Sequence, residues 1–562
     1  MKRTFSHIAK PWVFLLGGIL GFVLLAQLVR FRIDLTEEKR FSIHPGTEKV
    51  LAQIKEPLHV DILLVGENLP GGMRRLQKSI EETVRTFNAY SPEPISYSYF
   101  DPLKVDQAEQ EEFILSLVDY GINPTNLFVN QNSAQQAQLI FPGFLVSDSE
   151  FETGALVLKG ERGMSPDQIL NQSIENLEFE LSKAIQKLIS PTSSTIAMLI
   201  GHGENGQDDG FGIVEALDGE FEIFKVPLEQ AKKPADLATF KIIFIQSPKE
   251  QFSDREIYLL DQYVLNGGNL VVLMNGVAVS EEALSSGTTL GMSFETGLEN
   301  LLFRYGIRVN NDLIQDFNFG LIPTMAGNFG NQEQMRPMPW LYYFQAAIMQ
   351  NHPITKGLEV LNFRFASSID TVKAEGVTKT PLVFTSDYSR ILPAPLQISL
   401  DEIAIEPDPK AFELKNLPLG YLLEGEFTSV FKNRFAPEEF NKEDFNESGQ
   451  GKVVIFGDGE LFQSQLSYQD GSPLTLGEDQ LRQTTFANKA LLSNLVNYLA
   501  DPEGIIASRI RIIKIRPLNK VKVSEEKFFW QLINVALPVV VLLGIGGMVW
   551  AIRRKAYGKR ID

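Results

Sequence analysis

The sequence predicts an α/β fold, with two α/β domains between an N-terminal and a C-terminal transmembrane helix. Three observations lead to this prediction. Short β-branched runs alternate with amphipathic helical patterns, turns rich in Gly and Pro separate them, and an uncharged apolar segment stands near each end of the chain. The 562 residues are too many for a single hydrophobic core, and the 44% hydrophobic content suffices for more than one.

The two apolar segments have the length of membrane-spanning helices. Pro11–Val29 and Phe528–Ile552 contain no charged residue, and about 20 apolar residues cross the ~30 Å hydrocarbon layer of a bilayer. Side chains that favour the membrane interface stand near their ends: Trp12, Trp530, Trp550, Arg553, Arg554 and Lys555. A cleaved signal peptide is the alternative for the first segment, but its apolar run is longer than such peptides have and no A-x-A site follows.

Basic residues flank both segments on the side of the chain terminus. The positive-inside rule therefore places both termini in the cytoplasm and about residues 33–525 on the other side of the membrane. The chain carries a net charge of −18 and its two ends carry +5 and +4, so the residues between them carry −27. A surface that acidic repels nucleic acid. The absence of cysteine excludes disulfides, zinc–thiolate sites and thiol nucleophiles.

Residues 1–32 form the cytoplasmic tail and first transmembrane helix, and residues 33–190 are predicted to form the first α/β domain. Its expected elements are a strand over Leu58–Gly66, a helix over Met73–Tyr90, a strand over Ile95–Phe100, a helix near Val105–Tyr120, two strands between Gln138 and Leu158, and a long helix over Gln168–Ile189. A strand, a helix and a strand in succession are typical of a parallel βαβ unit.

Residues 191–525 are predicted to form the second α/β domain, with an inserted region at about 276–450, and residues 526–562 form the second transmembrane helix and a basic tail. The segment Lys241–Asn275 has the pattern of a buried strand, a helix and another buried strand. Ser253 and Glu256 have capping-box spacing at the start of that helix. We therefore expect a doubly wound parallel sheet.

The pattern of Lys241–Asn275 is also that of class I glutamine-amidotransferase-like folds. Enzymes of that class depend on a cysteine nucleophile, which this chain lacks. No G-x-S-x-G elbow offers a serine instead, no G-x-x-x-x-G-K-[ST] loop would bind a nucleotide, and the five histidines have no metal-binding spacing. These absences favour a non-enzymatic protein without a metal ion or cofactor.

The stretch Gly201-His202-Gly203-Glu204 follows a predicted strand, at the place where a doubly wound sheet binds ligands. One interpretation is a catalytic pair in which His202 is the base and Glu204 orients it. The other is a glycine turn whose polar side chains cap a helix, face solvent or bind a ligand without chemistry. The sequence favours the second interpretation, because it offers no companion residue for catalysis.

A second stretch of this kind, Gly457-Asp458-Gly459-Glu460, follows the buried strand that begins at Lys452. Asp458 and Glu460 are candidate ligand-binding residues. With Asp208 or Asp209 they could hold a hard cation, which prefers several oxygen ligands, but the sequence does not show which carboxylates converge.

Several stretches occur in the order found in a known family: DLTEEKRFSIHPGTEKVL, PKEQFSDREIYLLDQYVLNGGNLVVL, HPITKGLEVLNFRFASSID, KVVIFGDGELF and NKALLSNLVNYLADPEGI. Together they resemble the gliding-motility-associated ABC transporter accessory proteins of Bacteroidetes, the GldG-like proteins. The resemblance covers nearly the whole chain, including both terminal segments. One departure is His44, which stands where a small capping residue is expected.

The resemblance implies a subunit that works beside a separate ATPase and a separate permease in a bacterial inner membrane, with a periplasmic ectodomain and a role in gliding. Our first hypothesis is therefore a non-enzymatic accessory subunit. In a second, the acidic ectodomain binds a periplasmic protein partner or a ligand. The alternative from another class is a periplasmic hydrolase or amidase of amidotransferase-like fold that uses His202.

Overall fold

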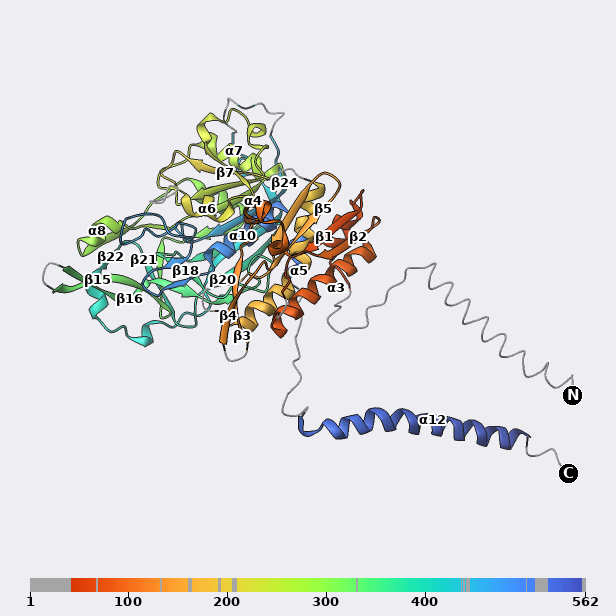
Figure 1. Ribbon diagram of the computed structural model, residues 1–562. Coiled ribbons are helices and arrows are strands. Elements are labelled where there is room, and N and C mark those ends of the chain that lie inside the picture. The colour runs from red at the N-terminus through yellow and green to blue at the C-terminus, as the bar shows by residue number, and fades with distance from the viewer. Residues whose placement is uncertain are drawn as a thin grey trace. The chain divides into compact units, whose positions relative to one another are not determined.

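The computed structural model describes residues 42–66, 69–131, 134–159, 164–190, 194–204, 210–329, 332–435, 437, 440, 445–501, 503–510 and 524–557. The chain divides into two compact units, Met1–Ile512 and Ile513–Asp562, and each is described by itself (Figure 1). The first predicted transmembrane segment, with Trp12, lies outside the described residues.

The N-terminal part of the first unit contains a four-stranded sheet in the order β2-β1-β5-β6. The strands are β1 (Leu58–Ile62), β2 (Ile95–Tyr99), β5 (Gly143–Ser147) and β6 (Glu152–Leu156). β1 and β2 are parallel and α3 (Gly71–Tyr90) connects them, which confirms the predicted βαβ unit. β5 pairs antiparallel with both β1 and β6, because no crossover helix separates β5 from β6.

The apolar face of α3 covers this sheet with four buried side chains, Leu76, Ile80, Val84 and Phe87, at helical spacing. The long helix α5 (Pro166–Ile189) packs beside it, and Ser165 and Gln168 form a capping box at its start. The shorter helices are α2 (Pro45–Ala52) and α4 (Gln107–Asp119), and β3 (Thr125–Gln131) pairs with β4 (Ala134–Ile140). His44 does cap α2, because its Nδ1 accepts a hydrogen bond from the Gly46 N–H at 3.1 Å.

The main sheet has eight strands in the order β17-β20-β23-β24-β10-β9-β7-β8. They are β7 (Thr195–Ile200), β8 (Glu222–Pro227), β9 (Ile242–Gln246), β10 (Asn269–Leu273), β17 (Ile348–Met349), β20 (Val377–Phe384), β23 (Pro418–Thr428) and β24 (Ser448–Phe456). The five from β24 to β8 are parallel, as predicted.

The prediction of an entirely parallel sheet is wrong for the other three strands. β23 pairs antiparallel with β24, β20 with β23, and β17 with β20. All three belong to the region 276–450, so this region extends the main sheet. The physical reason is connectivity: β24 follows β23 in the chain and lies beside it, and an antiparallel pair of this kind does not need the helical crossover that a parallel pair needs.

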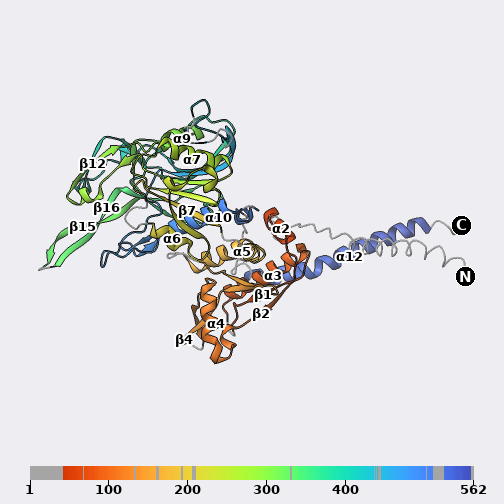
Figure 2. The ribbon, with the colours of Figure 1, turned by 90° about the horizontal axis from the view of Figure 1, so that it is seen from above.

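Helices cover both faces of the main sheet. Alternate residues of the parallel strands point to opposite sides, so that Ile243 and Ile245 join one core cluster and Ile242 and Phe244 the other. α7 (Asp254–Leu265) and α9 (Leu298–Tyr305) lie on the first face, and α6 (Phe211–Leu217) and α10 (Asn488–Ala500) on the second (Figure 2). This is the doubly covered arrangement that the continuous apolar runs predict.

The remaining strands of the region 276–450 form small sheets beside the carboxyl edge of the main sheet. They are β11 (Val277–Ala278), β12 (Thr288–Ser293) and β22 (Leu396–Ser399); β13 (Ile307–Val309) with β19 (Ile369–Thr371); β14 (Asp312–Asp316) with β21 (Ser389–Pro393); and the long hairpin β15 (Phe319–Phe329) and β16 (Gln332–Ala346) with β18 (Leu361–Arg364). The short elements α8 (Glu281–Ser285), β25 (Glu478–Asp479) and β26 (Thr484–Thr485) complete this part.

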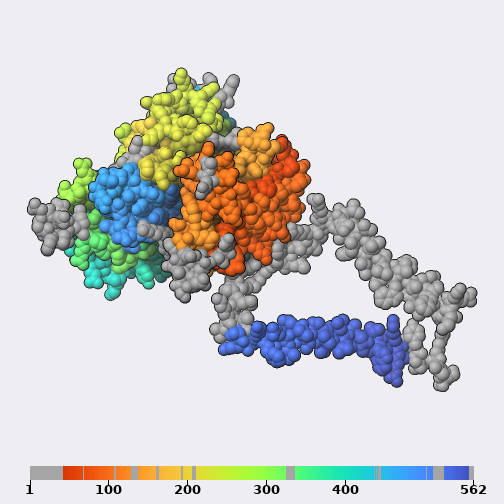
Figure 3. Space-filling model, viewed as in Figure 1, coloured from red at the N-terminus to blue at the C-terminus, as the bar shows by residue number. Residues whose placement is uncertain are grey.

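Short 3₁₀ turns connect these elements: η1 (Pro102–Lys104), η2 (Leu228–Gln230), η3 (Pro234–Leu237), η4 (Leu400–Ala404), η5 (Pro409–Ala411) and η7 (Ile505–Ile510). The last of them returns to the N-terminal part of the unit. Ile505 and Ile506 are buried in the core that α2, α3 and α5 form. The N-terminal and central parts therefore touch directly, as the space-filling view shows (Figure 3).

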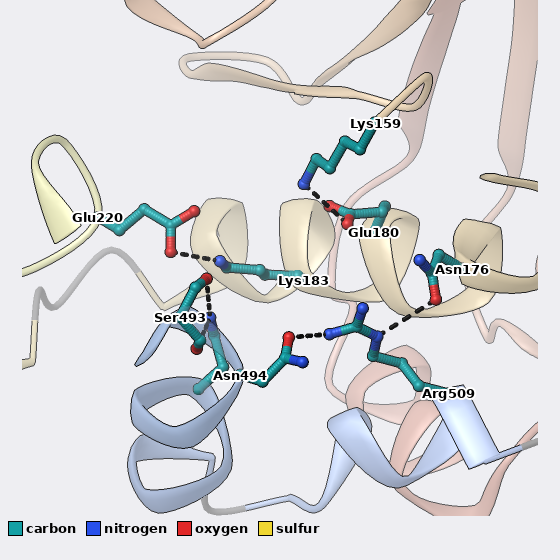
Figure 4. Close-up of polar contacts among 9 residues, drawn as sticks. Lys159, Asn176, Glu180, Lys183, Glu220, Ser493, Asn494 and Arg509 are labelled. Atoms are coloured by element: carbon teal, nitrogen blue, oxygen red, sulfur yellow. Dashed lines mark hydrogen bonds and ion pairs between the residues drawn. The ribbon is translucent and has the colours of Figure 1, made fainter. Parts of the chain in front are cut away.

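Polar contacts join α5 to the elements of the central part (Figure 4). Lys183 Nζ lies 2.7 Å from Glu220 Oε2, at the start of the loop before β8. Arg509 of η7 donates from Nε to Asn176 Oδ1 on α5 at 3.2 Å and from a second nitrogen to Asn494 on α10. Its guanidinium also lies over the Phe179 ring, 5.3 Å from the centroid. One arginine thus holds three elements together.

Replacing Arg509 with alanine is expected to lower the free energy of unfolding by about 2 kcal/mol, because two hydrogen bonds to a charged group and one cation–π contact are lost. Denaturant unfolding of the purified chain, with hydrogen exchange in α5 and η7, measures the effect. Arg308, whose exposed guanidinium pairs with Asp370, is the matched control, and R308A should cost less than about 1 kcal/mol. Equal losses for the two variants would contradict the bridging role of Arg509.

The second unit contains α12 (Lys527–Tyr557), a helix long and apolar enough to cross a membrane over Lys527–Lys555. Trp530 and Trp550 are exposed near its ends, and Arg553, Arg554 and Lys555 lie in its last turns. The second predicted transmembrane segment is therefore one continuous helix. Among the described residues it is the only helix that meets these length and composition criteria.

Candidate functional site

Polar turns follow four neighbouring parallel strands of the main sheet at its carboxyl edge. They are Gly201–Glu204 after β7, Ser247–Lys249 after β9, Asn275 after β10 and Gly457–Glu460 after β24. The two stretches that the sequence analysis selected thus lie on the same edge of one sheet, which is where α/β sheets bind ligands. The Gly459 N–H donates to Asn275 Oδ1 at 2.6 Å and joins two of the turns.

The imidazole of His202 lies between two carboxylates. Its Nδ1 is 3.1 Å from Glu204 Oε1, and its Nε2 is 3.2 Å from Glu256 Oε1 on α7. The ring stacks on Phe252 with a centroid distance of 3.8 Å. The side chains are well enclosed, since His202 is 10% exposed and Glu204 is 0% exposed.

His202 therefore links two acidic side chains, one from the turn after β7 and one from α7. Each ring nitrogen of His202 lies within hydrogen-bonding or ion-pairing distance of a carboxylate oxygen, so acidic side chains engage both nitrogens. A general base needs a free nitrogen lone pair that faces its substrate, and here a carboxylate faces each nitrogen. The structure brings the predicted pair His202 and Glu204 together, and it adds Glu256 at the other ring nitrogen.

Glu256 has two roles in the structure. Its Oε2 accepts hydrogen bonds from the Ser253 backbone N–H at 2.8 Å and from the Ser253 hydroxyl at 2.6 Å, which completes the predicted capping box. Burial by itself would raise the pKa of Glu256, but the Ser253 hydrogen bonds and the positive charge of His202 outweigh it and hold this pKa below its usual value. The capping spacing reveals Glu256 in the sequence, whereas its contact with His202 arises only in the fold.

The turn after β7 also positions the loop after β9. The His202 carbonyl oxygen accepts from the backbone N–H groups of Lys249 at 2.8 Å and Glu250 at 3.0 Å. Gly201 and Gly203 have φ angles of +120° and +74°, a region that favours glycine. At Gly203 a Cβ would also lie 3.2 Å from Lys249 Cβ. The glycines and His202 together fix the backbone from which the Lys249 side chain extends.

Asp458 is fully buried and stabilises the second turn. Its two carboxyl oxygens accept from the backbone N–H groups of Arg364 at 2.8 Å and Glu460 at 2.7 Å. Burial raises the pKa of Asp458 to about 7, although these hydrogen bonds and the nearby Arg364 lower it in part. The carboxyl group thus links the turn after β24 to β18.

Glu460 lies in a different environment from Asp458, because its side chain lines a cavity. Burial raises the pKa of Glu460 to about 8, and the negative charge of Glu281 adds to this shift. Arg364 and Lys249 act in the opposite direction. Burial therefore favours the protonated form of this carboxyl group, which can donate a hydrogen bond.

The hypothesis of a cation site involved Asp458, Glu460 and Asp208 or Asp209. Both of the latter lie outside the described residues. Within the part of the chain that the structure describes, no group of three or more His, Asp or Glu side chains is placed to hold a metal ion.

A cavity of about 650 Å³ opens at this edge of the sheet. Its polar and charged lining comes from five places in the chain: Ser247 and Lys249; Ser280, Glu281 and Glu282; Tyr343; Asn362 and Arg364; and Glu460, Gln463, Ser464, Gln465, Ser467, Tyr468 and Asp479. Of the residues selected from the sequence, only Glu460 lines it. His202 acts at a distance, through the backbone of Lys249.

The sequence patterns did not predict three of the lining residues, Arg364, Tyr343 and Glu281. All three belong to the region 276–450, where the secondary-structure pattern is loose. One signal was present: Arg364 stands between two phenylalanines in NFRF, and a charge inside a short apolar strand requires a reason.

Comparison with known proteins gives matches over most of the chain. The profile of a family described as "ABC-type uncharacterized transport system" matches residues 193–495, and that of a domain of unknown function (DUF7088) matches residues 37–147. An uncharacterized protein of Borreliella burgdorferi is 22% identical over 545 residues and covers 94% of each chain.

Two solved structures show weak likeness. The mmIFT52 N-terminal domain has 16% identity and a TM-score of 0.31, with 55% of this chain and 97% of that chain covered. A putative ThuA-like protein from Parabacteroides merdae has 10% identity and a TM-score of 0.25, with 58% and 94% covered. Both TM-scores are too low to define a common fold.

The family match includes the whole parallel half of the main sheet, the carboxyl edge and the cavity. It extends over more than half of the 562 residues. The chain belongs to the family of ABC-type uncharacterized transport systems, in which it is an auxiliary component.

Proposed function

We propose that the protein is a non-enzymatic, membrane-anchored accessory subunit of an ABC transporter complex linked to gliding motility. The observation that carries this proposal is the family match over residues 193–495 in a chain that also has an apolar helix, α12, of membrane-spanning length. The link to gliding rests on the sequence resemblance described above. The fully engaged ring of His202 supports a non-enzymatic role over the hydrolase alternative.

The charge pattern supports a definite orientation for this subunit. Basic residues follow α12 directly, so both termini are proposed to lie in the cytoplasm and residues of about 33–525 in the periplasm of a bacterial inner membrane. The ectodomain, with its net charge of −27, is then available to bind a periplasmic partner or ligand.

The partners proposed for the membrane side are a separate ATPase and a separate permease. The sequence contains no P-loop, so nucleotide hydrolysis of that kind must take place on another chain. Along α12, Gly544 and Gly547 lie three residues apart on one helical face. Small residues at this spacing let the backbone of a neighbouring helix approach closely, so this face is proposed to contact the permease.

Co-purification tests the proposal. The tagged full-length chain, extracted in mild detergent, is expected to bring down the ATPase and the permease of the same organism. A double variant, Gly544→Leu and Gly547→Leu, should reduce the yield of both partners while the chain still inserts in the membrane. The matched control is Val539→Leu with Val549→Leu, which keeps the small residues and should leave the yield unchanged. A wild-type chain that purifies alone under all mild conditions would refute the assignment.

A further inference from the structure

Arg364 lies in the cavity at the carboxyl edge with an unused set of hydrogen-bond donors. Along β18, Leu361 and Phe363 point into the core, and the alternation turns Asn362 and Arg364 toward the cavity. Within the part of the chain that the structure describes, the guanidinium makes no hydrogen bond and no ion pair. The guanidinium lies over the face of Tyr343, 5.3 Å from the ring centroid.

An enclosed guanidinium without an acceptor is costly. Protein atoms surround Arg364 closely, and only part of its surface faces the cavity. A buried charge is normally paired, and each arginine presents five N–H donors in a planar fork that fits two oxygen atoms of a carboxylate or a phosphate. The carboxyl groups of Glu460, Glu281 and Asp458 lie close enough to act on its charge. Among them, Glu281 accepts a hydrogen bond from the Tyr343 hydroxyl at 2.7 Å.

Lys249 brings a second positive charge to the same cavity. The loop that carries it is held by the His202 carbonyl, as described above. The backbone around the cavity is also strained. Ser247, two residues before Lys249, and Phe365, directly after Arg364, have φ angles of +52° and +44°, which non-glycine residues rarely adopt. Such strain persists only where the surrounding fold imposes it, and it is common at binding sites.

The carboxyl groups of the cavity do not cancel these two cations. Burial raises the pKa of Glu460 and favours its protonated form, which can donate a hydrogen bond to a bound anion. Asp479 already accepts from the backbone N–H groups of Leu481 and Arg482. Glu281 accepts a hydrogen bond from the Tyr343 hydroxyl, and Glu282 lies at the solvent-exposed rim of the cavity.

We propose that this cavity binds a small ligand through an oxyanion group, a carboxylate or a phosphate. The guanidinium of Arg364 donates hydrogen bonds to this group, and the positive charge of Lys249 helps to neutralise it. The Glu460 carboxyl group and the Ser247 hydroxyl line the same space and complete the polar shell. The inference goes beyond the transporter assignment and does not depend on it, because it concerns the cavity alone.

Calorimetric titration of the full-length chain in detergent tests the proposal, with inorganic phosphate and succinate as the two probes. At least one of them is expected to bind with one-to-one stoichiometry. Arg364→Gln, which removes the charge and the fork, should weaken this binding at least about tenfold, and Arg364→Lys, which keeps only the charge, should weaken it less. Arg336→Gln is the control, because Arg336 is exposed on β16 and does not line the cavity.

The pattern of binding identifies the source of the oxyanion. Binding of phosphate alone assigns a phosphorylated ligand, and binding of succinate alone assigns a carboxylate. Thermal unfolding of each variant shows whether it is folded, and Arg364→Lys keeps the test valid if Arg364→Gln is not. The proposal is overturned if neither probe binds up to millimolar concentration, or if binding is the same in both Arg364 variants as in the wild type.

Discussion

Replacing His202 with alanine is expected to lower the free energy of unfolding by roughly 3 kcal/mol or more, the cost of breaking an enclosed ion pair from one side. The substitution leaves the carboxylates of Glu204 and Glu256 facing each other without the imidazole ring that lies between them. It also removes the ring that stacks on Phe252. His202→Ala therefore weakens the contact between the turn after β7 and the first turn of α7.

Denaturant unfolding of the full-length chain measures this loss. His59→Ala is the matched control, because His59 also contacts an acidic side chain, Asp61, but its own side chain is 41% exposed. The control should cost less than about 1 kcal/mol. His202→Ala could instead abolish function in cells while its unfolding curve matched that of the wild type. The stabilising role of the contacts between His202, Glu204 and Glu256 would then be wrong, and the catalytic interpretation of His202 would gain support.

Raising the pH from about 4.5 to about 8 is expected to destabilise the protein through Glu460. Its pKa in the folded state is raised to about 8, so over this window the folded chain holds a proton that the unfolded chain has released. The contribution of Glu460 to stability is then greatest below the ordinary pKa of a glutamate. It falls as the pH rises toward the pKa of Glu460 in the folded protein, by up to about 1.4 kcal/mol per pH unit. Asp458, with a pKa of about 7, acts in the same direction.

Unfolding experiments between pH 4.5 and 8 measure this slope. Glu460→Gln keeps the shape of the side chain but does not ionise, so it should flatten the slope and stabilise the protein at pH 8. Glu282→Gln, at the rim of the same cavity, should change neither. Glu256 does not interfere, because its pKa is lowered and its contribution is lost only as the pH falls through values below the usual one for glutamate. An unchanged slope in Glu460→Gln would show that Glu460 is ionised in the folded protein.

Local sequence patterns predicted the elements of the fold where neighbouring residues decide the structure. The helical face of α3, the capping box of Ser253 and Glu256, and the buried runs of β9 and β10 all lie where the sequence placed them. The direction of β20 and β23 was not predictable in this way. It depends on which strand edge is free when the chain returns, and this is a property of the assembled sheet.

The candidate site also combines features that local sequence predicts with features that only tertiary contacts create. The sequence places Gly201–Glu204 and Gly457–Glu460 after buried strands, and parallel packing then brings both turns to one edge. It does not reveal that Glu256 reaches His202, nor that Asp458 accepts a hydrogen bond from a residue 94 positions away in β18.

By itself, then, the sequence determined the alternation of strands and helices, the apolar C-terminal helix, the acidic middle of the chain and the absence of a cysteine nucleophile and a P-loop. These properties follow from composition and from periodicities within about 20 residues. Only the tertiary structure decided that His202 lies between two carboxylates and that Arg364 lines a cavity beside the Tyr343 ring. The physical reason is that ion pairing, desolvation and cavity shape depend on side chains from distant strands, and folding alone brings those side chains within reach of one another.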